Sequence, residues 1–540
     1  MLFVVFFWRL GQPSFWDPDE PHYAQTSSEM LASGEFRVPV YDGKPFFDKP
    51  VLFHALQATA MWVLGPTELA ARLFTALAAL ALVGVTRWLG AALFDAETGD
   101  LAALMLATTP GMFAFARCAI LDMVFTAFLV SGIGLIAVSA FRGRPRLQYA
   151  GYALLALAVL TKGPLALALT GLTFGVTIAL SGEARRRILE LHWLAGLGAV
   201  ILLSAPWFLW MWSRFGDAFV EGYVLRENLL LFSEPLYGDQ PSSFFYPRVV
   251  AAGLLPWTPL VAGYAIDRLR AAFRGRVDDA AEVAVWAWAI AVPGFFTLSS
   301  FKLDHYVLPA GPAFCLLAAR GWRGLAGATT LRPWAATSLA AASVGVLLAG
   351  GGVFLTAFGS ALPLDLPAWA LLGPLAMVAA GAASTLDILR SRGKPRRRPL
   401  SVVFGLACVY ATLLAFVLPA LESAKAVRDV GRWVAAHAKP EDRVASYLND
   451  TFGMSASWRF YLGRTPQVLT GWGEIGRFLA APGRAYCAME REHYDFLRAA
   501  GLPIRIAHER DALLTTTHLR FGSVETLRWR RFVVATNTAP

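Results

Sequence analysis

Long apolar runs alternate with short polar loops along most of this chain, and that alternation limits its fold more than any other feature. A helix that crosses a membrane needs about 20 mostly apolar residues. By length and apolarity we predict spans at 68–94, 101–116, 121–141, 147–160, 165–180, 193–212, 246–266, 280–298, 306–319, 333–358, 366–389 and 400–421. The predicted fold class is a polytopic α-helical membrane protein.

Both ends of this helical region depart from the pattern. Residues 1–10 are apolar but short, so we expect a first span that is truncated or crosses incompletely, which brings the count to about thirteen. Residues 51–64 end at Gly65-Pro66 and are expected to form a helix at the membrane interface. From residue 425 the chain becomes polar, with strand-like and helical segments interleaved. We therefore predict a membrane domain at 1–424 and a small soluble α/β domain at 425–540.

Charge distribution predicts the orientation of these spans. Only 16% of residues are charged while 56% are hydrophobic, and the net charge is +10. The basic residues gather in short loops at 142–146, 185–187, 268–276, 320–332 and 390–398. Such clusters face the cytoplasm by the positive-inside rule, and this distribution argues against nucleic-acid binding. The loops 15–50 and 214–245 and the C-terminus are then outside. The residue usage is typical of bacteria, so we expect an inner-membrane protein with these parts in the periplasm.

The loop at 15–50 carries an unusual set of charges beside the membrane. Its closely spaced motifs are Pro18-Asp19-Glu20, Tyr23-Ala24, Glu29-Met30-Leu31, Gly34, Val38-Pro39 and Phe47-Asp48-Lys49-Pro50. This pattern resembles the first extracytoplasmic loop of membrane glycosyltransferases that use polyprenyl-phosphate sugars. That family includes the protein O-mannosyltransferases and the bacterial lipid A aminoarabinose transferases. The resemblance covers about residues 16–319 and implies the C-type glycosyltransferase fold.

The resemblance implies a reaction in which a sugar moves from a polyprenyl (undecaprenyl) phosphate to a lipid or protein acceptor at the outer face. It assigns Asp19 as the base that takes the acceptor proton, with Glu20 beside it and Asp122 shaping the site. Asp19 also suits the N-cap of a helix beginning at Pro21, and Asp122 suits an ion pair with Arg117. Asp17-Pro18-Asp19 has the form DxD, but a lipid monophosphate offers no diphosphate to chelate. We expect no catalytic metal and no cofactor.

Cations near the outer face are candidates for holding the phosphate of the donor. Lys49 matches the lysine that closes the family's loop, and Lys302 with Tyr306 matches a second family motif. Lys162, in Thr161-Lys162-Gly163-Pro164, matches a family turn, and each lysine would otherwise be an interfacial side chain. Arg226 is a further candidate, because the aminoarabinose transferases have an arginine where this chain has Leu231.

Other functions remain open from the residues alone. A lipid or sugar transporter, or flippase, also has many spans, but we find no inverted repeat, and the charges gather at one face. A membrane scaffold with an outer binding domain would leave Asp19, Lys49 and Lys302 without a shared purpose. The histidines at 22, 54 and 305 fit no recognised metal-ligand spacing. Pro21-His22 replaces a Thr-Arg pair of the aminoarabinose transferases, which argues against that particular sugar. The expected partners are the lipid-linked donor, a glycolipid or protein acceptor, and membrane lipids.

Overall fold

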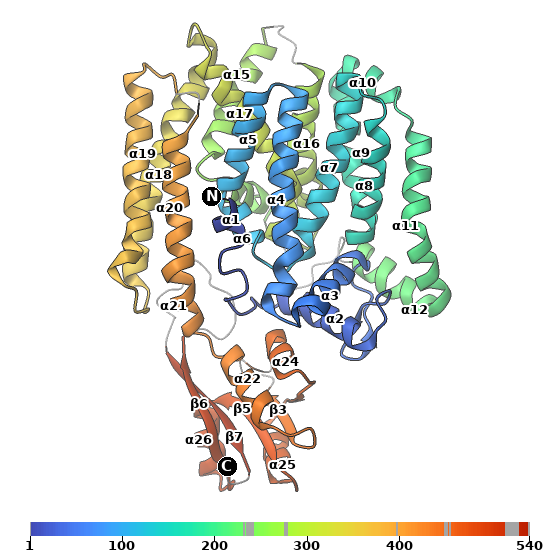
Figure 1. Cartoon of the computed structure of the whole chain (residues 1–540), viewed down its shortest axis with the longest axis vertical. Coiled ribbons are helices and arrows are strands. Elements are labelled where there is room, and N and C mark those ends of the chain that lie inside the picture. Colours follow the sequence, from blue (N-terminus) through green and yellow to red (C-terminus); the bar gives the residue numbers. More distant parts are fainter. Residues whose placement is uncertain are drawn as a thin grey trace.

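A helical bundle and a smaller sheet-containing part make up the protein in a computed structural model (Figure 1). The structure describes residues 2–230, 233, 242–274, 279–395, 398–447, 452, 455–513 and 529–537. In Figure 1 the sheet lies beyond one end of the bundle, at the end where α2 (Asp19–Ser33) and α3 (Leu52–Leu64) are found. Helix α10 (Gly182–Leu189), which carries three arginines, lies at the opposite end.

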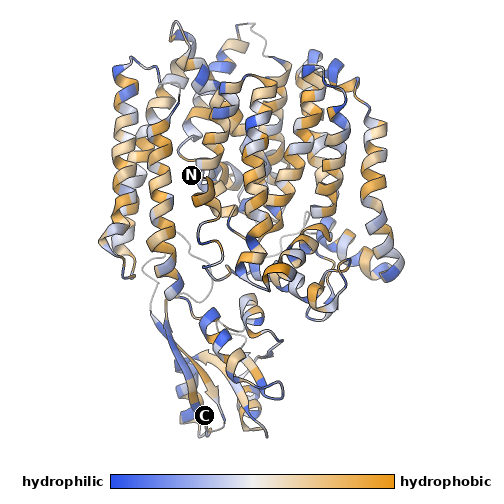
Figure 2. Cartoon of the chain, in the orientation of Figure 1, coloured by the Kyte–Doolittle hydropathy of each residue, from blue (hydrophilic) through white to orange (hydrophobic). Residues whose placement is uncertain are grey.

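Seven helices of the described residues are long and apolar enough to cross a membrane, so the protein is a multi-pass membrane protein. They are α4 (Glu68–Leu93), α7 (Leu121–Arg142), α11 (Trp193–Phe215), α16 (Ala280–Thr297), α18 (Ala335–Ala361), α19 (Leu372–Arg390) and α20 (Leu400–Thr412) with its continuation through η5 (Leu413–Val417) and α21 (Leu418–Ser423). A broken pair, α14 (Phe245–Gly253) and α15 (Thr258–Ala272), bends by 112°. Figure 2 shows apolar residues along the bundle and polar residues concentrated toward its two ends.

The other predicted spans correspond to shorter helices. They are α5 (Ala96–Thr108), α6 (Pro110–Phe115), α8 (Leu147–Lys162), α9 (Leu165–Leu180) and α17 (Gly311–Ala326). The prediction of about thirteen spans therefore exceeds the seven long helices, or eight with the bent pair, that meet the length criterion among the described residues. Residues 1–10 supply only the short α1 (Leu2–Phe6). The predicted helix at 51–64 is present as α3.

Basic clusters from different loops are joined by ion pairs at one end of the bundle. Arg142 pairs with Asp279 at 2.8 Å, and Arg320 pairs with Glu282 at 2.9 Å. Asp100 in the first half of α5 forms an ion pair with Arg398 at 3.1 Å. Residues 275–278 and 396–397 of these clusters lie outside the described residues. The described clusters therefore share one end, as the positive-inside pattern predicts.

Small residues allow the spanning helices to approach closely. A side-chain carbon at Gly345 of α18 would lie 2.6 Å from the carbonyl oxygen of Gly381 in α19, and one at Gly381 would lie 2.4 Å from the carbonyl oxygen of Gly345. Contacts this short leave no room for a methyl group. Close backbone packing at small residues is a usual way for helices to associate in lipid.

The C-terminal part is a five-stranded mixed sheet with helices, which confirms the predicted α/β composition. Its strands are β3 (Arg443–Tyr447), β4 (Gln467–Leu469), β5 (Ala485–Glu490), β6 (Arg505–Ala512) and β7 (Arg530–Thr536), in the order β4-β3-β5-β7-β6. β3 is parallel to β4 and β5, whereas β7 is antiparallel to β5 and β6. Helices α22 (Val427–His437), α24 (Ala456–Leu462), α25 (Trp472–Ala480) and α26 (Arg491–Ala499) accompany the sheet.

Candidate functional site

The polar loop at 15–50 folds into α2 and a short hairpin, β1 (Val40–Tyr41) with β2 (Lys44–Pro45). Gly34 ends α2 in a left-handed conformation, with φ of 70°, which glycine adopts without steric cost. The chain then passes Asp48 and Lys49 and enters α3. This path brings α2, which begins at Asp19, and α3, which begins three residues after Lys49, to one end of the bundle (Figure 1).

Glu20 anchors the start of α2 to the bundle. Its carboxylate lies 2.7 Å from Arg72 of α4, and both side chains are almost fully buried. The same carboxylate accepts hydrogen bonds from the backbone N–H of Trp16 at 2.8 Å and of Ala119 at 2.6 Å. Because both oxygens are occupied by these contacts, the geometry favours a positioning role for Glu20 over the expected catalytic one.

The C-terminal part also holds this loop. Asp17 accepts hydrogen bonds from the Ser455 hydroxyl and the Ser457 backbone N–H, each at 2.8 Å. The Tyr461 hydroxyl accepts a hydrogen bond from the backbone N–H of Phe15 at 2.9 Å. Helix α24 therefore contacts the segment immediately before Asp19.

Asp19 is half-buried at the first position of α2. Burial raises the pKa of Asp19, and nearby Asp122 acts in the same direction, whereas His305 and His22 act to lower it. These influences place Asp19 in the same charged environment as Asp122 and His305. A carboxylate with a raised pKa is a stronger base than an exposed one, which suits the predicted role.

Asp122, at the start of α7, joins two other parts of the bundle. Its carboxylate forms a buried ion pair with Lys162 at the end of α8. The His305 ring nitrogen Nε2 lies 3.5 Å from the other oxygen of Asp122. Lys162 also lies 4.4 Å from the centre of the Tyr306 ring. Three residues predicted separately, Asp122, Lys162 and Tyr306, are thus brought together, and the pairing of Asp122 with Arg117 is replaced by one with Lys162.

Lys49 lies between two carboxylates. Its ammonium is 2.5 Å from Asp48 and 2.9 Å from Glu227, which belongs to the π-helix η1 (Val220–Leu230). Burial acts to lower the pKa of Lys49, but the two carboxylates outweigh it and hold that pKa above its usual range. Burial and a hydrogen bond with Asp48 raise the pKa of Glu227 to about 7. Asp48 behaves in the opposite way, because Lys49 and Glu227 outweigh its burial and lower its pKa to about 2.

A cavity of about 270 Å³ opens beside these groups. Its lining contains both polar and apolar residues and includes Asp48, Lys49, Lys162, Tyr223, Glu227, Asn228 and Tyr306, with Leu165, Ala168, Phe295 and Phe296. Cations beside an apolar wall suit a ligand that has an anionic head and a hydrocarbon tail. Chemically, the arrangement can hold a lipid phosphate near a carboxylate base.

Two predicted phosphate ligands lie elsewhere. Lys302 donates to the backbone carbonyl of Ser299 at 2.5 Å, and it does not line the cavity. Arg226 is 69% exposed and pairs with Glu221 at 3.1 Å. Leu231, where the family's arginine was expected, lies outside the described residues. The roles of Lys302 and Arg226 as phosphate ligands stay predictions that this geometry does not favour.

Sequence reasoning missed Glu227 as a member of the site. It lies 178 residues from Lys49 along the chain, so no local pattern joins the two. Its only sequence signal is an acidic residue in an outer loop next to an apolar segment. Among the described residues, no group of three or more His, Cys, Asp or Glu side chains is placed to hold a metal ion.

The fold is the one found in C-type membrane glycosyltransferases. It is similar to the crystal structure of ArnT from Cupriavidus metallidurans bound to undecaprenyl phosphate, with a TM-score of 0.73 and 21% identity over 100% of this chain and 97% of that chain. The apo structure of the same protein matches equally well, with a TM-score of 0.73. Residues 1–214 match the family model for dolichyl-phosphate-mannose-protein mannosyltransferase.

Two relatives with higher sequence identity carry the same name. The undecaprenyl phosphate-alpha-4-amino-4-deoxy-L-arabinose arabinosyl transferase of Edwardsiella ictaluri is 28% identical over 327 residues, which is 59% of this chain and 58% of that protein. The protein of the same name from Pectobacterium carotovorum is 30% identical over 318 residues, or 58% of this chain and 56% of that one. The alignments thus span a little more than half the length of these curated relatives.

Proposed function

We propose that the protein is an integral-membrane glycosyltransferase that moves a sugar from undecaprenyl phosphate to a lipid or protein acceptor. One observation carries this proposal. Lys49 and the buried Lys162 line one cavity that also has apolar walls, and the half-buried Asp19 lies in the electrostatic environment of Asp122, which pairs with Lys162. The relatives named above suggest 4-amino-4-deoxy-L-arabinose as the first sugar to test, and lipid A as the first acceptor.

In the proposed reaction an acceptor oxygen forms a bond to the anomeric carbon as the bond between that carbon and the phosphate oxygen breaks. Asp19 takes the proton of the acceptor hydroxyl, and its raised pKa brings it closer to the pH at which a general base works best. The departing polyprenyl phosphate gains negative charge, which Lys49 and Lys162 stabilise. Asp122 holds Lys162 in place through their buried ion pair.

We further propose that the site faces the periplasm of a bacterial inner membrane. The basic clusters of the described residues gather at one end of the bundle, and the loop at 15–50 with the sheet lies at the other (Figure 1). Residues 1–424 would then form the membrane domain, and residues 425–540 the soluble one. Labelling of single introduced cysteines in intact cells tests this orientation.

The test of function uses the purified protein in detergent with radiolabelled undecaprenyl phosphate-4-amino-4-deoxy-L-arabinose and lipid A. Wild-type protein is expected to convert the donor to undecaprenyl phosphate and a labelled acceptor. Asp19→Asn and Lys49→Ala are expected to lose this turnover. Glu35→Gln is the matched control, because Glu35 lies on the same loop and pairs only with neighbouring Arg37 in the described contacts. Donor transfer that persists in Asp19→Asn would refute the assignment of the base.

If no labelled acceptor forms, a panel of other undecaprenyl-phosphate sugars and of protein acceptors follows. Failure across that panel, with folded protein, would reject the transferase and leave lipid transport as the alternative to examine. Reconstitution in vesicles, with the donor placed on one side, measures that transport directly.

A further inference from the structure

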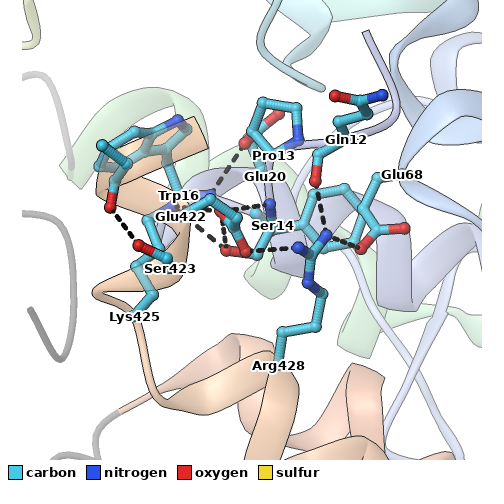
Figure 3. A network of polar contacts seen from close by, with 12 residues as sticks. Gln12, Pro13, Ser14, Trp16, Glu20, Glu68, Glu422, Ser423, Lys425 and Arg428 are labelled. Atoms are coloured by element: carbon cyan, nitrogen blue, oxygen red, sulfur yellow. Dashed lines mark hydrogen bonds and ion pairs between the residues drawn. The ribbon is translucent and has the colours of Figure 1, made fainter. Parts of the chain in front are cut away.

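A second polar cavity, separate from the one beside Lys49, lies where the N-terminal segment, the bundle and the C-terminal part meet. Its volume is about 410 Å³, and it shares no lining residue with the first cavity. Five separate stretches of chain line it: the segment after α1, the start of α4, the turn after α6, the η5–α21 segment and α22. Figure 3 shows part of its wall, with Arg428 of α22 between Glu68 and Glu422.

Positive charge is in excess in this cavity. Four arginines line it, Arg9, Arg117, Arg428 and Arg432, against two carboxylates, Glu68 and Glu422. Glu68 forms ion pairs with Arg428 at 3.3 Å and with Arg432 at 3.2 Å, and Glu422 forms one with Arg428 at 2.7 Å. Both carboxylates are thus already shared with arginines of α22.

The other two arginines are held by backbone carbonyl groups. Arg9 donates to the carbonyl of Ala415 at 2.9 Å, and Arg117 donates to those of Val5 at 3.1 Å and Trp8 at 2.9 Å. In the part of the chain that the structure describes, neither arginine pairs with a carboxylate. Burial, together with nearby Arg72, lowers the pKa of Arg117 to about 10.

Donor groups also remain available. A guanidinium carries five N–H donors, and Arg432 uses only its Nη2 nitrogen in the contacts with Glu68 while its side chain is 59% exposed. Guanidinium groups bind phosphate with paired hydrogen bonds, so clusters of them are typical of phosphate recognition. The excess of positive charge and the free N–H donors both favour binding of a phosphate group.

The surroundings indicate that the anion belongs to a lipid. Leu414, Leu418 and Pro419 form an apolar wall of the cavity. An apolar cavity of about 560 Å³ lies on a neighbouring side of the same helical segment, where Leu413, Val417 and Leu421 face α18 and α19. A phosphate in the arginine cavity would therefore have space for acyl chains beside it.

We propose that this cavity binds the phosphate of a lipid headgroup, at a site distinct from the donor cavity. Arg9, Arg117 and Arg432 supply the charge, and the acyl chains lie along the η5–α21 segment. The proposal does not depend on the proposed transferase reaction, because the two cavities are separate.

The test measures equilibrium binding of short-chain dioctanoyl phosphatidic acid to the purified full chain in detergent. Dioctanoylglycerol, which lacks the phosphate, and inorganic phosphate, which lacks the chains, are the comparison probes. We expect saturable binding of the phosphatidic acid, no binding of the glycerolipid, and an affinity for inorganic phosphate at least about tenfold lower. Equal affinity for inorganic phosphate would overturn the lipid assignment, and equal affinity for the glycerolipid would overturn the anion site.

Variants localise the binding. Arg432→Gln is expected to weaken phosphatidic acid binding by about 5- to 20-fold, since one charged hydrogen-bond partner is lost from a half-exposed position. Arg531→Gln is the matched control, because Arg531 is 49% exposed in the same C-terminal part and pairs with Asp511. Its affinity should stay within about twofold of wild type. Unchanged binding by Arg432→Gln would refute the site.

Two further variants test whether a loss of binding comes from misfolding and whether the lipid occupies the donor cavity. Gln12→Glu adds one negative charge beside Arg9 while keeping the size of the side chain, and it should also weaken binding. Lys49→Ala should leave unchanged the part of phosphatidic acid binding that Arg432→Gln weakens. If Lys49→Ala abolishes it instead, the lipid occupies the donor cavity and the proposal fails. Failure of the transferase assay alone would leave these results intact.

Discussion

Replacing Glu227 with glutamine tests how the proposed donor site accepts its phosphate. Lys49 is already neutralised by Asp48 and Glu227, whose carboxylates lie 2.5 and 2.9 Å from its ammonium. An incoming phosphodiester must therefore share Lys49 with two negative groups. Because the pKa of Glu227 is raised to about 7, this carboxyl is the one that is most easily neutralised by a proton. We expect Glu227→Gln to bind the donor more tightly than wild type.

The size of the effect follows from the charges involved. Two like charges 4 Å apart repel by about 4 kcal/mol at an effective dielectric constant of 20. The side chains of Lys49 and Glu227 are 17% and 25% exposed, so water screens part of this repulsion, and Glu227 also has room to move away. We therefore expect a gain of about 1–2 kcal/mol above pH 8, equal to about 5- to 30-fold in Kd.

The pH dependence has a defined sign. Wild-type affinity is expected to be highest below pH 7, where Glu227 is protonated, and to fall as the pH rises through about 7. Glu227→Gln should remove that dependence, so the two proteins should agree within about twofold near pH 6. The phosphodiester of the donor has no second proton to lose, so its charge stays constant over this range, and comparison with Glu227→Gln at each pH separates the titration of Glu227 from that of the amino group of the sugar.

Equilibrium binding of radiolabelled donor without acceptor, at pH 6 and pH 8, measures the effect. Glu221→Gln is the control, since Glu221 lies on the same helix and pairs with exposed Arg226. Weaker donor binding by Glu227→Gln at both pH values would contradict the reasoning, because it would mean that Glu227 is needed to hold Lys49 in place.

Three other predictions concern single residues. Asp19→Asn should lower kcat by at least about 100-fold and leave the donor Kd within about twofold, because the base acts on the acceptor. Single-turnover kinetics measures the two effects separately. Glu20→Ala should lower the free energy of unfolding by about 3 kcal/mol or more, since Arg72 would be left buried without its partner. Thermal unfolding in detergent measures this loss. An unchanged Tm would refute the anchoring role. Arg226→Gln should change the donor Kd by less than about twofold, because the only described ion pair of Arg226 is an exposed one with Glu221. A tenfold loss of donor affinity would instead support Arg226 as a phosphate ligand.

Helices were the most predictable part of this protein. Each predicted span coincides with a helix or a broken helix, because apolar length alone decides which segments lie in a membrane. The bend between α14 and α15 was not foreseen, since the run at 246–266 reads as continuous. The strand-like segments of the sequence correspond to β3, β4, β5 and β7, whereas β6 was not predicted. The strand order β4-β3-β5-β7-β6 depends on long-range packing.

The site was predictable in part. The motifs of the 15–50 loop pointed to Asp19 and Lys49, and the structure brings α2 and α3, which begin at or just after them, to one end of the bundle. Pairings between distant segments could not be predicted, because they depend on how helices pack. The ion pair of Asp122 with Lys162 spans 40 residues, and that of Lys49 with Glu227 spans 178. The contact that anchors Glu20 could not be predicted for the same reason, since its partner Arg72 is visible only after α2 and α4 are placed together.

The contact of α24 with the loop before Asp19 has a consequence for how the protein loses its structure. Asp17 is bonded to Ser455 and Ser457, and Phe15 is bonded to Tyr461. The C-terminal part therefore cannot detach without breaking its contacts with the segment immediately before Asp19. Melting of the sheet should loosen residues 15–17 while the buried pair of Glu20 with Arg72 still holds α2, so a chain cut after residue 424 would keep its helices yet lose one of the two attachments that position Asp19.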